Sequence, residues 1–267
     1  MALRAAGWPV TGWGPRPQTL QLALELGAID RVASSPGAAV AQAELVIASG
    51  PIRTLPMLFR SVAAAAAPGT IVTDVASVKG EVMAWARDTL PPYLEFVGGH
   101  PMAGREQTGV RSASAELFRG CTYCLVPTSG RSLEAGETLA AAVGAQALVV
   151  EAEAHDLAVA ATSHLPFVVS TALVGAVQGD LAGLAGTVGS SGFRDTTRIA
   201  AGSPEMHADI CHYNQPAITQ WIERFQRQLE NLKAQLSQDS IQQTFSDARE
   251  ARLAWAERKA SEKGANP

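Results

Sequence analysis

The sequence predicts a doubly wound α/β domain with a parallel sheet, joined to a second domain made only of helices. Short apolar runs alternate with helical stretches from Trp8 to about Thr128, as strand–helix–strand units require. The runs are continuously apolar, which is typical of parallel strands that are covered on both faces. After about Ala152 the strand pattern stops and long helical patterns follow. We therefore expect one domain over residues 1–151 and another over residues 152–267.

The strands expected in the first domain share a short apolar core, and in chain order they are "WPVTGW", "ELVIASG", "TIVTDVAS", "LEFVGGHP" and "TYCLVP". Helical stretches such as "PQTLQLALELG" and "TLPMLFRSVAAAAAPG" separate them. The last strand carries Cys121 and Cys124 at the spacing of a redox or zinc motif. Residues three apart on a strand point to opposite faces, and no second pair exists, so core cysteines are favoured over that alternative.

The second domain contains an apolar stripe at helical spacing, formed by Ile218, Trp221, Ile222, Phe225, Leu229 and Leu232. Such a stripe needs a partner, either the core of the same chain or a second copy. The helices look long for a domain of this size, so we favour in part a homodimer seam. Upstream, Pro166 removes a helical hydrogen bond and is expected to kink the helix beside His164. His155 and His164 lie nine residues apart, half a rotation out of phase on a regular helix, and cannot share a metal there.

Composition limits the partners of the chain. It has 267 residues, 47% of them hydrophobic and 17% charged, with a net charge of −4. A negative chain is a poor ligand for nucleic acid or anionic membranes, so a small anionic substrate must meet a local cluster of arginines. No apolar run reaches the roughly 18 residues of a membrane span, and no signal peptide is visible. These features predict a cytoplasmic protein.

The glycine-rich loop of a dinucleotide-binding fold, G-x-G-x-x-G, occurs nowhere in the sequence. Met1 to Ala6 reads as the end of the helix that follows this loop, and Gly7 as its terminal glycine. We therefore expect that about 15–20 residues, holding the first strand and the loop, precede the given start. The missing strand is central in this fold, so "PVTGW" and "TIVTDV" are expected about 9–10 Å apart, two strand spacings.

Cofactor-binding residues are expected where the other strands end. The second strand usually ends in a carboxylate that binds the adenosine ribose, but here Gly14 is followed by Pro15 and Arg16. An arginine without a carboxylate favours NADP, with NAD as the alternative and a solvated Arg16 as the simplest reading. Ser49 and Pro51, in "VIASGP", and Asp74, at the end of "TIVTD", are expected to flank the cofactor.

Candidate catalytic residues follow the next strand ends. His100 comes after two glycines and before a proline in "VGGHPMAGRE", so its backbone is rigid and its ring projects from the edge where this fold binds ligands. Histidine titrates near neutral pH, as a general base should. Ser77, in "DVASVKG", is a second candidate, although a helix cap is the alternative reading. Arg194 and Arg198 share a helix face and suggest a carboxylate clamp, the alternative being a surface pattern.

The motifs "VTDVASVKGEV", "FVGGHPMAGRE.TGV", "LFRG", "HD...A..SHLPF" and "GFRDTTRIA.GSPEM..DI" resemble the prephenate/arogenate dehydrogenase family of tyrosine biosynthesis, in order from about Leu3 to Ile210. The resemblance implies a Rossmann-like domain joined to a helical dimerisation domain. It also implies oxidative decarboxylation of a cyclohexadienol with NAD or NADP.

By motif position, the resemblance makes His100 the catalytic histidine and Ser77 the serine that assists at the ring hydroxyl. Arg198 would bind a substrate carboxylate, with Arg194, His164 and Lys79 as further substrate-binding residues. Many members read Ser-His-Leu-Pro-His, but here the second histidine is replaced by Phe167. This makes arogenate a candidate substrate beside prephenate.

Two other functions remain open at this point. A hydroxy-acid dehydrogenase or imine reductase of the same two-domain plan is one, although it would not need Gly-Gly-His-Pro at the fifth strand. The second is a dimeric relative that is catalytically inactive because it lacks the cofactor loop.

Overall fold

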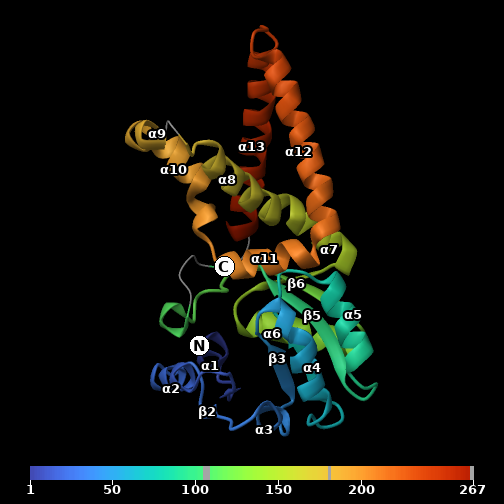
Figure 1. Cartoon of the computed structure of the whole chain (residues 1–267). Helices are drawn as coiled ribbons and strands as arrows, with labels where there is room; N and C mark the ends of the chain where they lie inside the picture. The colour runs from blue at the N-terminus through green and yellow to red at the C-terminus, as the bar shows by residue number, and fades with distance from the viewer. Residues whose placement is uncertain (105–108, 180–181, 265–267) are drawn as a thin grey trace. The chain divides into compact units, whose positions relative to one another are not determined.

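The computed structural model describes residues 1–104, 109–179 and 182–264 (Figure 1). It divides into two compact units, Met1–Ile218 and Thr219–Pro267, and each is described by itself. The first unit holds both sheets and the helices up to α11, and the second holds a pair of long helices.

A five-stranded sheet in the order β3-β4-β5-β6-β7 forms the centre of the first unit. Its neighbouring strands are parallel except for the pair β5 and β6, which is antiparallel. The strands are β3 (Leu45–Ala48), β4 (Ile71–Asp74), β5 (Glu95–Pro101), β6 (Thr122–Pro127) and β7 (Gln146–Val149).

The antiparallel strand β6 corrects the expected all-parallel sheet. Pro101 at the end of β5 pairs with Tyr123 at the start of β6, so the chain turns back at the same edge of the sheet. Within the described part of the connection only a 3-10 turn at Val110–Ser112 forms. A parallel strand needs a crossover connection, usually a helix, and the sequence between these strands offers none.

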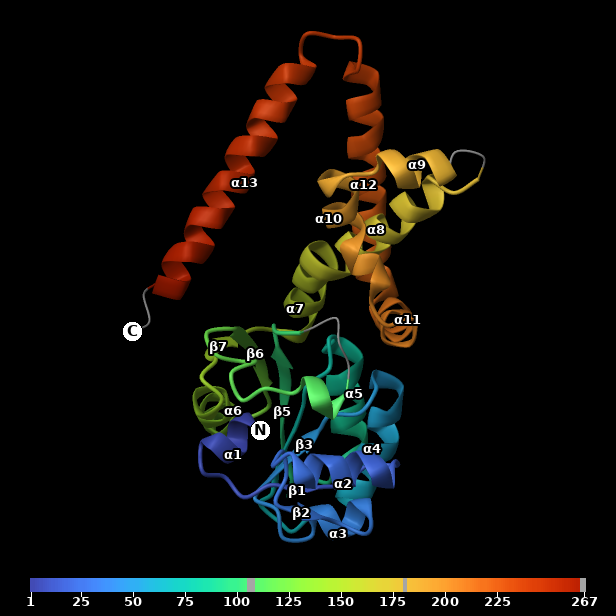
Figure 2. The same ribbon diagram turned by 90° about the vertical axis from the view of Figure 1, so that its left-hand side faces the viewer.

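Helices cover both faces of this sheet, as the continuously apolar strands predicted. Helices α4 (Leu55–Ala63) and α5 (Gly80–Thr89) lie on one face and α6 (Gly130–Ala142) on the other (Figure 2). On the first face Phe59 meets Phe96 edge to face, with ring centroids 5.4 Å apart. The doubly wound architecture predicted from the sequence is confirmed.

A separate two-stranded sheet pairs β1 (Thr11–Gly12) with β2 (Arg31–Val32) in parallel. The small helices on this side are α1 (Ala2–Ala5), α2 (Pro17–Glu25) and α3 (Pro36–Val40). As expected, β1 does not pair with β4. The sequence prediction named the wrong neighbour for the missing strand, however. Strand β4 already has β3 and β5 beside it, so the edge strand next to the break is β3.

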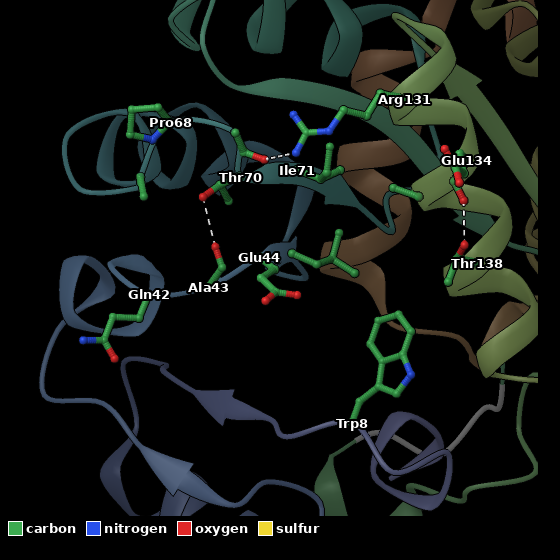
Figure 3. A pocket seen from close by; sticks show the side chains of 14 residues that line it. Trp8, Gln42, Ala43, Glu44, Pro68, Thr70, Ile71, Arg131, Glu134 and Thr138 are labelled. Atoms are coloured by element: carbon green, nitrogen blue, oxygen red, sulfur yellow. Dashed lines mark hydrogen bonds between the residues drawn. The ribbon is translucent and has the colours of Figure 1, made fainter.

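A cavity of about 580 Å³ opens beside this break in the sheet (Figure 3). Trp8, which precedes β1, forms one wall, and the starts of β3 and β4, at Leu45 and Ile71, form another. Arg131 and Glu134 of α6 also line it. The cavity therefore lies at the amino ends of β3 and β4, whereas ligands of such sheets bind at the carboxyl ends.

The helical part of the first unit begins with α7 (Ala152–Val159) and α8 (Leu165–Ala176), which a π-helical turn at Ala160–His164 joins into one helix. The π turn lies next to Pro166, where the sequence predicted a disturbed helix, because proline cannot donate the regular bond. The helices that follow are α9 (Ala182–Val188), α10 (Ser191–Thr197) and α11 (Pro204–Tyr213). No strand forms in the described residues after β7, as predicted.

This continuous helix corrects one expectation from the sequence. Ala152–Ala176, 25 residues, is long and apolar enough to cross a membrane by length and composition. The run escaped notice because His155, Asp156 and His164 interrupt its apolar residues, although all three are buried in the folded chain. A helix that buries three polar side chains against its own domain is better explained as a domain helix.

The second unit contains the helices α12 (Gln215–Gln235), which starts in the first unit, and α13 (Ile241–Gly264). Their turn is held by Thr244, whose hydroxyl donates to the Gln235 side chain at 2.7 Å. On α12 the Arg224 guanidinium lies 4.6 Å from the centre of the Trp221 ring. That the apolar stripe of α12 forms part of a homodimer interface stays a prediction.

Candidate active site

His100 lies one residue before the end of β5, at the edge of the sheet where β4 also ends. The two glycines before it are required by close packing. A Cβ on Gly99 would stand 2.5 Å from the Asp74 carbonyl oxygen, and one on Gly98 would stand 2.7 Å from the Met83 sulfur. The glycines thus let β5 approach its neighbours closely, and this fixes where His100 leaves the sheet.

A buried ion pair holds this strand end in place. The Lys79 ammonium contacts the Asp74 carboxylate and donates to the Gly99 carbonyl at 2.7 Å, and both charged side chains are 0% exposed. Asp74 in turn accepts from the Gly99 N–H at 3.0 Å and the Ala76 N–H at 2.8 Å. Burial lowers the pKa of Lys79, and the attraction of Asp74 opposes that shift.

These contacts bear on two predicted ligand-binding residues. The sequence assigned Asp74 to the cofactor and Lys79 to the substrate, but both side chains are enclosed and satisfied by neighbours of the first unit. We interpret them as the support of His100, and direct contact with a ligand stays a prediction. Ser77 lies between them in the loop from β4 to α5 and is half-buried.

A chain of hydrogen bonds leads from His100 into the helical part of the unit. His100 Nδ1 lies 2.9 Å from His155 Nε2, and His155 Nδ1 lies 2.8 Å from Asp156 Oδ1. Asp156 also accepts from the backbone N–H groups of Lys79 and Gly80, at 2.7 and 2.8 Å, where α5 begins. The carboxylate therefore stands at a helix N-terminus, where negative charge is stabilised.

Burial disfavours the protonated form of His100 and so keeps its imidazole neutral. Its pKa is lowered to about 2, first by burial and then by the neighbouring His155, Lys79 and His164. A neutral imidazole at neutral pH has one free lone pair and can accept a proton from a bound hydroxyl group. The direction of its hydrogen bonds thus suits a general base, whereas the lowered pKa makes the imidazole a weak one.

His164 forms a second buried imidazole nearby. Asn214 donates from Nδ2 to His164 Nδ1 at 3.2 Å and to the Asp156 carbonyl at 2.8 Å. His164 Nε2 must then carry the proton, and this buried group has no hydrogen-bond partner in the described structure. Burial lowers the pKa of His164 to about 4, against the attraction of Asp156. A buried donor that is left over is available to a ligand, in keeping with the predicted role of His164.

Phe167, which replaces the second histidine of the family motif, stacks on another imidazole. The rings of Phe167 and His207 are 3.5 Å apart and nearly coplanar, at 7°. His207 Nδ1 donates to the Ser203 carbonyl at 2.9 Å, which orients the ring. Of the five histidines in the chain, His155 and His164 lower the pKa of His100, and His155 and His207 lower the pKa of His164. Within the described residues they form no metal-binding group.

The two predicted arginines are exposed. Arg194 lies on α10 and pairs with its neighbour Asp195 at 2.9 Å. Arg198 follows the helix directly and keeps helical dihedral angles, φ −51° and ψ −43°, so the two remain about one turn apart on one face. The turn that starts at Arg198 is fixed to α8, because the Ala200 N–H donates to the Ser170 hydroxyl at 3.1 Å.

The predicted cofactor residues other than Asp74 lie after the ends of β1 and β3. Ser49 and Pro51 follow β3 and are exposed. Gly14, after β1, lines a second cavity of about 430 Å³, together with Trp13, Leu20 and Val32. The lining contains no acidic side chain, and Arg16 is exposed beside it.

The cavity beside Gly14 has mostly apolar walls, and Gly14 has no side chain to fill it. Both features suit an adenosine group. The pyrophosphate end does not fit the described residues, because no glycine-rich turn offers its N–H groups there.

Sequence reasoning missed several residues that the structure brings together. His155 and Asp156 were read only as helix residues, although they form the inner end of the chain that starts at His100. Arg53, after β3, contacts Glu205 and lies 3.2 Å from Asp209, which ties the β3 loop to α11. The "HD" pair at the start of the helix was the signal for the first set, and none marked Arg53. The "GRE" part of the His100 motif lies partly outside the described residues.

A doubly wound sheet with a supported histidine at a strand end, joined to a helical domain, defines a two-domain protein of the nucleotide-binding dehydrogenase class. Residues 1–149 match the family "Prephenate dehydrogenase, nucleotide-binding domain", and residues 151–247 match "Prephenate dehydrogenase, dimerization domain". The chain belongs to the prephenate dehydrogenase family.

Curated relatives and solved structures agree with this placement. A Bacillus subtilis prephenate dehydrogenase is 33% identical over 84% of this chain and 62% of its own length. A Zymomonas mobilis cyclohexadienyl dehydrogenase is 32% identical over 87% of this chain and 81% of its own.

Among structures, an arogenate dehydrogenase from Synechocystis aligns with a TM-score of 0.81 and 29% identity, over 95% of this chain and 94% of its own. An Aquifex aeolicus prephenate dehydrogenase with hydroxyphenyl propionate and NAD+ aligns with a TM-score of 0.87 and 28% identity, over 95% and 92%. The chain spans less than two thirds of the Bacillus relative.

Proposed function

We propose that this chain is a prephenate or arogenate dehydrogenase, which oxidises and decarboxylates a cyclohexadienol with a nicotinamide cofactor. The product is 4-hydroxyphenylpyruvate from prephenate, or tyrosine from arogenate. The observation that carries the proposal is His100, a neutral imidazole at the carboxyl edge of the sheet with its Nδ1 bonded inward to His155. The relatives that share the fold act on these substrates by name.

In the proposed mechanism His100 accepts the proton of the ring hydroxyl, assisted by Ser77 from the loop after β4. When bound, the nicotinamide cofactor supplies the hydride acceptor. Arg198, with Arg194 and the His164 Nε2–H group, holds substrate carboxylates and so fixes the ring. Loss of carbon dioxide leaves an aromatic ring, which drives the reaction forward.

NADP is the cofactor that the adenosine side favours. The cavity beside Gly14 has no carboxylate that would bind the ribose 2′-hydroxyl, and Arg16 is at hand for a 2′-phosphate. NAD, which the Aquifex structure holds, is the alternative.

Two further properties belong to this proposal. The chain forms a homodimer through its helical region, which would cover exposed apolar side chains such as Leu184 and Val188, 60% and 69% exposed. The match to a dimerisation domain supports this assembly. A cytoplasmic location fits a biosynthetic dehydrogenase of this kind.

One observation favours a second candidate function. The five-stranded sheet is separated from β1 and β2, and the sequence holds no glycine-rich turn for a pyrophosphate. An inactive dimeric relative would show these features. Titrating the chain with NADP and NAD, and then following nicotinamide absorbance after addition of prephenate or arogenate, tests both. Reduction that disappears in His100→Asn supports the enzyme, and a chain that binds neither cofactor supports the inactive relative.

A further inference from the structure

A histidine that acts as a base must leave one particular ring nitrogen without a proton. A neutral imidazole carries its proton on either Nδ1 or Nε2, and only the other nitrogen can accept one. His100 has its Nδ1 directed at His155, so the nitrogen left for a substrate is Nε2. The tautomer of His100 therefore decides whether it can act.

The direction of the hydrogen bonds can be followed outward from Asp156. Its carboxylate accepts from the backbone N–H groups of Lys79 and Gly80, so it acts as an ionised acceptor. His155 Nδ1, 2.8 Å from Asp156 Oδ1, must then be the donor. With the proton on Nδ1, a neutral His155 offers a lone pair on Nε2. His100 Nδ1, 2.9 Å from that lone pair, must carry a proton.

We propose that His155 and Asp156 are positioning residues that hold His100 in the Nδ1–H tautomer and keep Nε2 free to accept the substrate proton. The tautomer follows from the hydrogen bonds alone, whereas its importance for turnover rests on the proposed function. The catalytic group remains His100, and the other two act only through it.

The same series of hydrogen bonds, from His100 through His155 to Asp156, stabilises His100 after it has taken the proton. As the hydroxyl O–H bond breaks and the Nε2–H bond forms, the ring becomes positive. Its Nδ1–H then donates to His155, which is held by the negative Asp156. His155 is 2% exposed, so water does not compete for these bonds. Charge-assisted hydrogen bonds in such surroundings are strong.

Two substitutions at position 155 separate orientation from simple packing. His155→Leu fills the space but offers no lone pair to His100. In His155→Gln the amide oxygen can accept from His100 Nδ1 while the amide nitrogen donates to Asp156, which keeps the direction of the bonds. His212, on α11 against the Tyr213 ring, gives a matched control as His212→Gln.

The direct test is the tautomer of His100, read by long-range proton–nitrogen correlation of the full chain with ¹⁵N-labelled histidine. The chain has five histidines, and the signal lost in His100→Asn assigns the one of interest. We expect a protonated Nδ1 in the wild type, His155→Gln and His212→Gln, and a shift toward protonated Nε2 in His155→Leu. A protonated Nε2 in the wild type would overturn the proposal, and so would an unchanged tautomer in His155→Leu. If His155→Leu does not fold, the wild-type tautomer still decides.

Kinetics give the second readout. We expect kcat of His155→Leu to fall roughly 10²–10⁴-fold, the usual contribution of general acid–base catalysis, with KM nearly unchanged. His155→Gln should recover much of this loss. Equal losses in both variants would contradict a positioning role. If the wild type reduces no cofactor with either substrate, the proposed function fails, but the tautomer measurement still judges this inference.

Discussion

Two regions of the protein differ in how closely their parts are joined. One is the carboxyl end of β4 and β5, and the other is the break between β1 and β3. At the carboxyl end of β4 and β5, buried contacts join Asp74, Lys79 and Gly99, the residue directly before His100. At the second, two-residue strands stand apart from the main sheet, and a cavity of about 580 Å³ opens beside Trp8. The groups proposed for proton transfer are thus organised within the described chain, while the phosphate-binding part of the cofactor site is not.

This contrast separates two kinds of effect. Changes at the bonded edge should alter turnover or folding, because the residues there hold His100 or one another. Changes near Gly14 should alter cofactor affinity and choice, because the cavity beside it is the proposed adenosine site. Substitutions in the two regions can test this separation.

The largest effect is expected from His100→Asn. Removal of a general base typically lowers turnover roughly 10²–10⁴-fold. Cofactor affinity should stay nearly constant, because His100 lies on β5 and not on the adenosine side. Steady-state kinetics and a cofactor titration measure both quantities. Turnover close to that of the wild type would remove His100 from the mechanism.

Replacing Lys79 by methionine should destabilise the fold by about 3–5 kcal/mol, because Asp74 would keep a buried charge without its partner. Urea unfolding followed by circular dichroism measures the change. Lys233→Met is the matched control, since Lys233 pairs with Glu230 on the surface and should change stability by no more than about 0.5 kcal/mol. Equal effects of the two substitutions would contradict a stabilising buried ion pair between Lys79 and Asp74.

Acid should weaken the fold through His100 and His164, whose pKa values are lowered to about 2 and about 4. An unfolded histidine titrates near 6.5, so the unfolded chain binds more protons between these values and is favoured as the pH falls. From pH 7 to pH 5 each residue should remove about 2 kcal/mol. Urea midpoints at both pH values measure this, and His164→Gln should reduce the difference. A variant with the full wild-type pH dependence would count against a neutral buried His164.

Arg198→Ala should raise KM roughly 10- to 100-fold, the size of one or two charge-assisted hydrogen bonds to a carboxylate. Arg194→Ala should have a smaller effect, because the family motif assigns the carboxylate to Arg198 and the Arg194 side chain is 73% exposed. Initial rates over a range of substrate concentrations compare the two. An unchanged KM in Arg198→Ala would show that Arg198 does not bind the substrate carboxylate.

The smallest effect is expected on the adenosine side. Gly14→Asp would place a carboxylate beside the ribose and shift the ratio of kcat/KM for NADP and NAD toward NAD by about tenfold, or about 1.4 kcal/mol. Turnover at saturating cofactor should change little. A wild type that already prefers NAD would show that Arg16 does not read a 2′-phosphate.

Local sequence signals marked the place of His100 and five of the seven strands in the described residues. They missed β2 and β7, whose side chains are mostly exposed. Continuous apolar runs marked the strands, and glycines before the histidine marked a strand end. Pairing between distant segments could not be foreseen in the same way. The direction of β6 depends on its partner, and the free edge beside the break belongs to β3 because β4 has two neighbours.

The burial of Lys79 and the contact of His155 with His100 also escaped prediction, for a related reason. A lysine after a strand is usually exposed, and only the nearby Asp74 and Gly99 explain why this one is enclosed. His155 lies 55 residues from His100, on the first turns of α7. Such contacts come from tertiary packing, which helical periodicity does not encode.

The most direct test of the account is a cofactor-saturated assay of the wild type and His100→Asn with prephenate and with arogenate. Reduced nicotinamide and released carbon dioxide are measured together, after a titration has shown that cofactor binds. The account predicts equal amounts of both products from the wild type with at least one substrate, and almost none from the variant. Bound cofactor with no reduction by either substrate would contradict it.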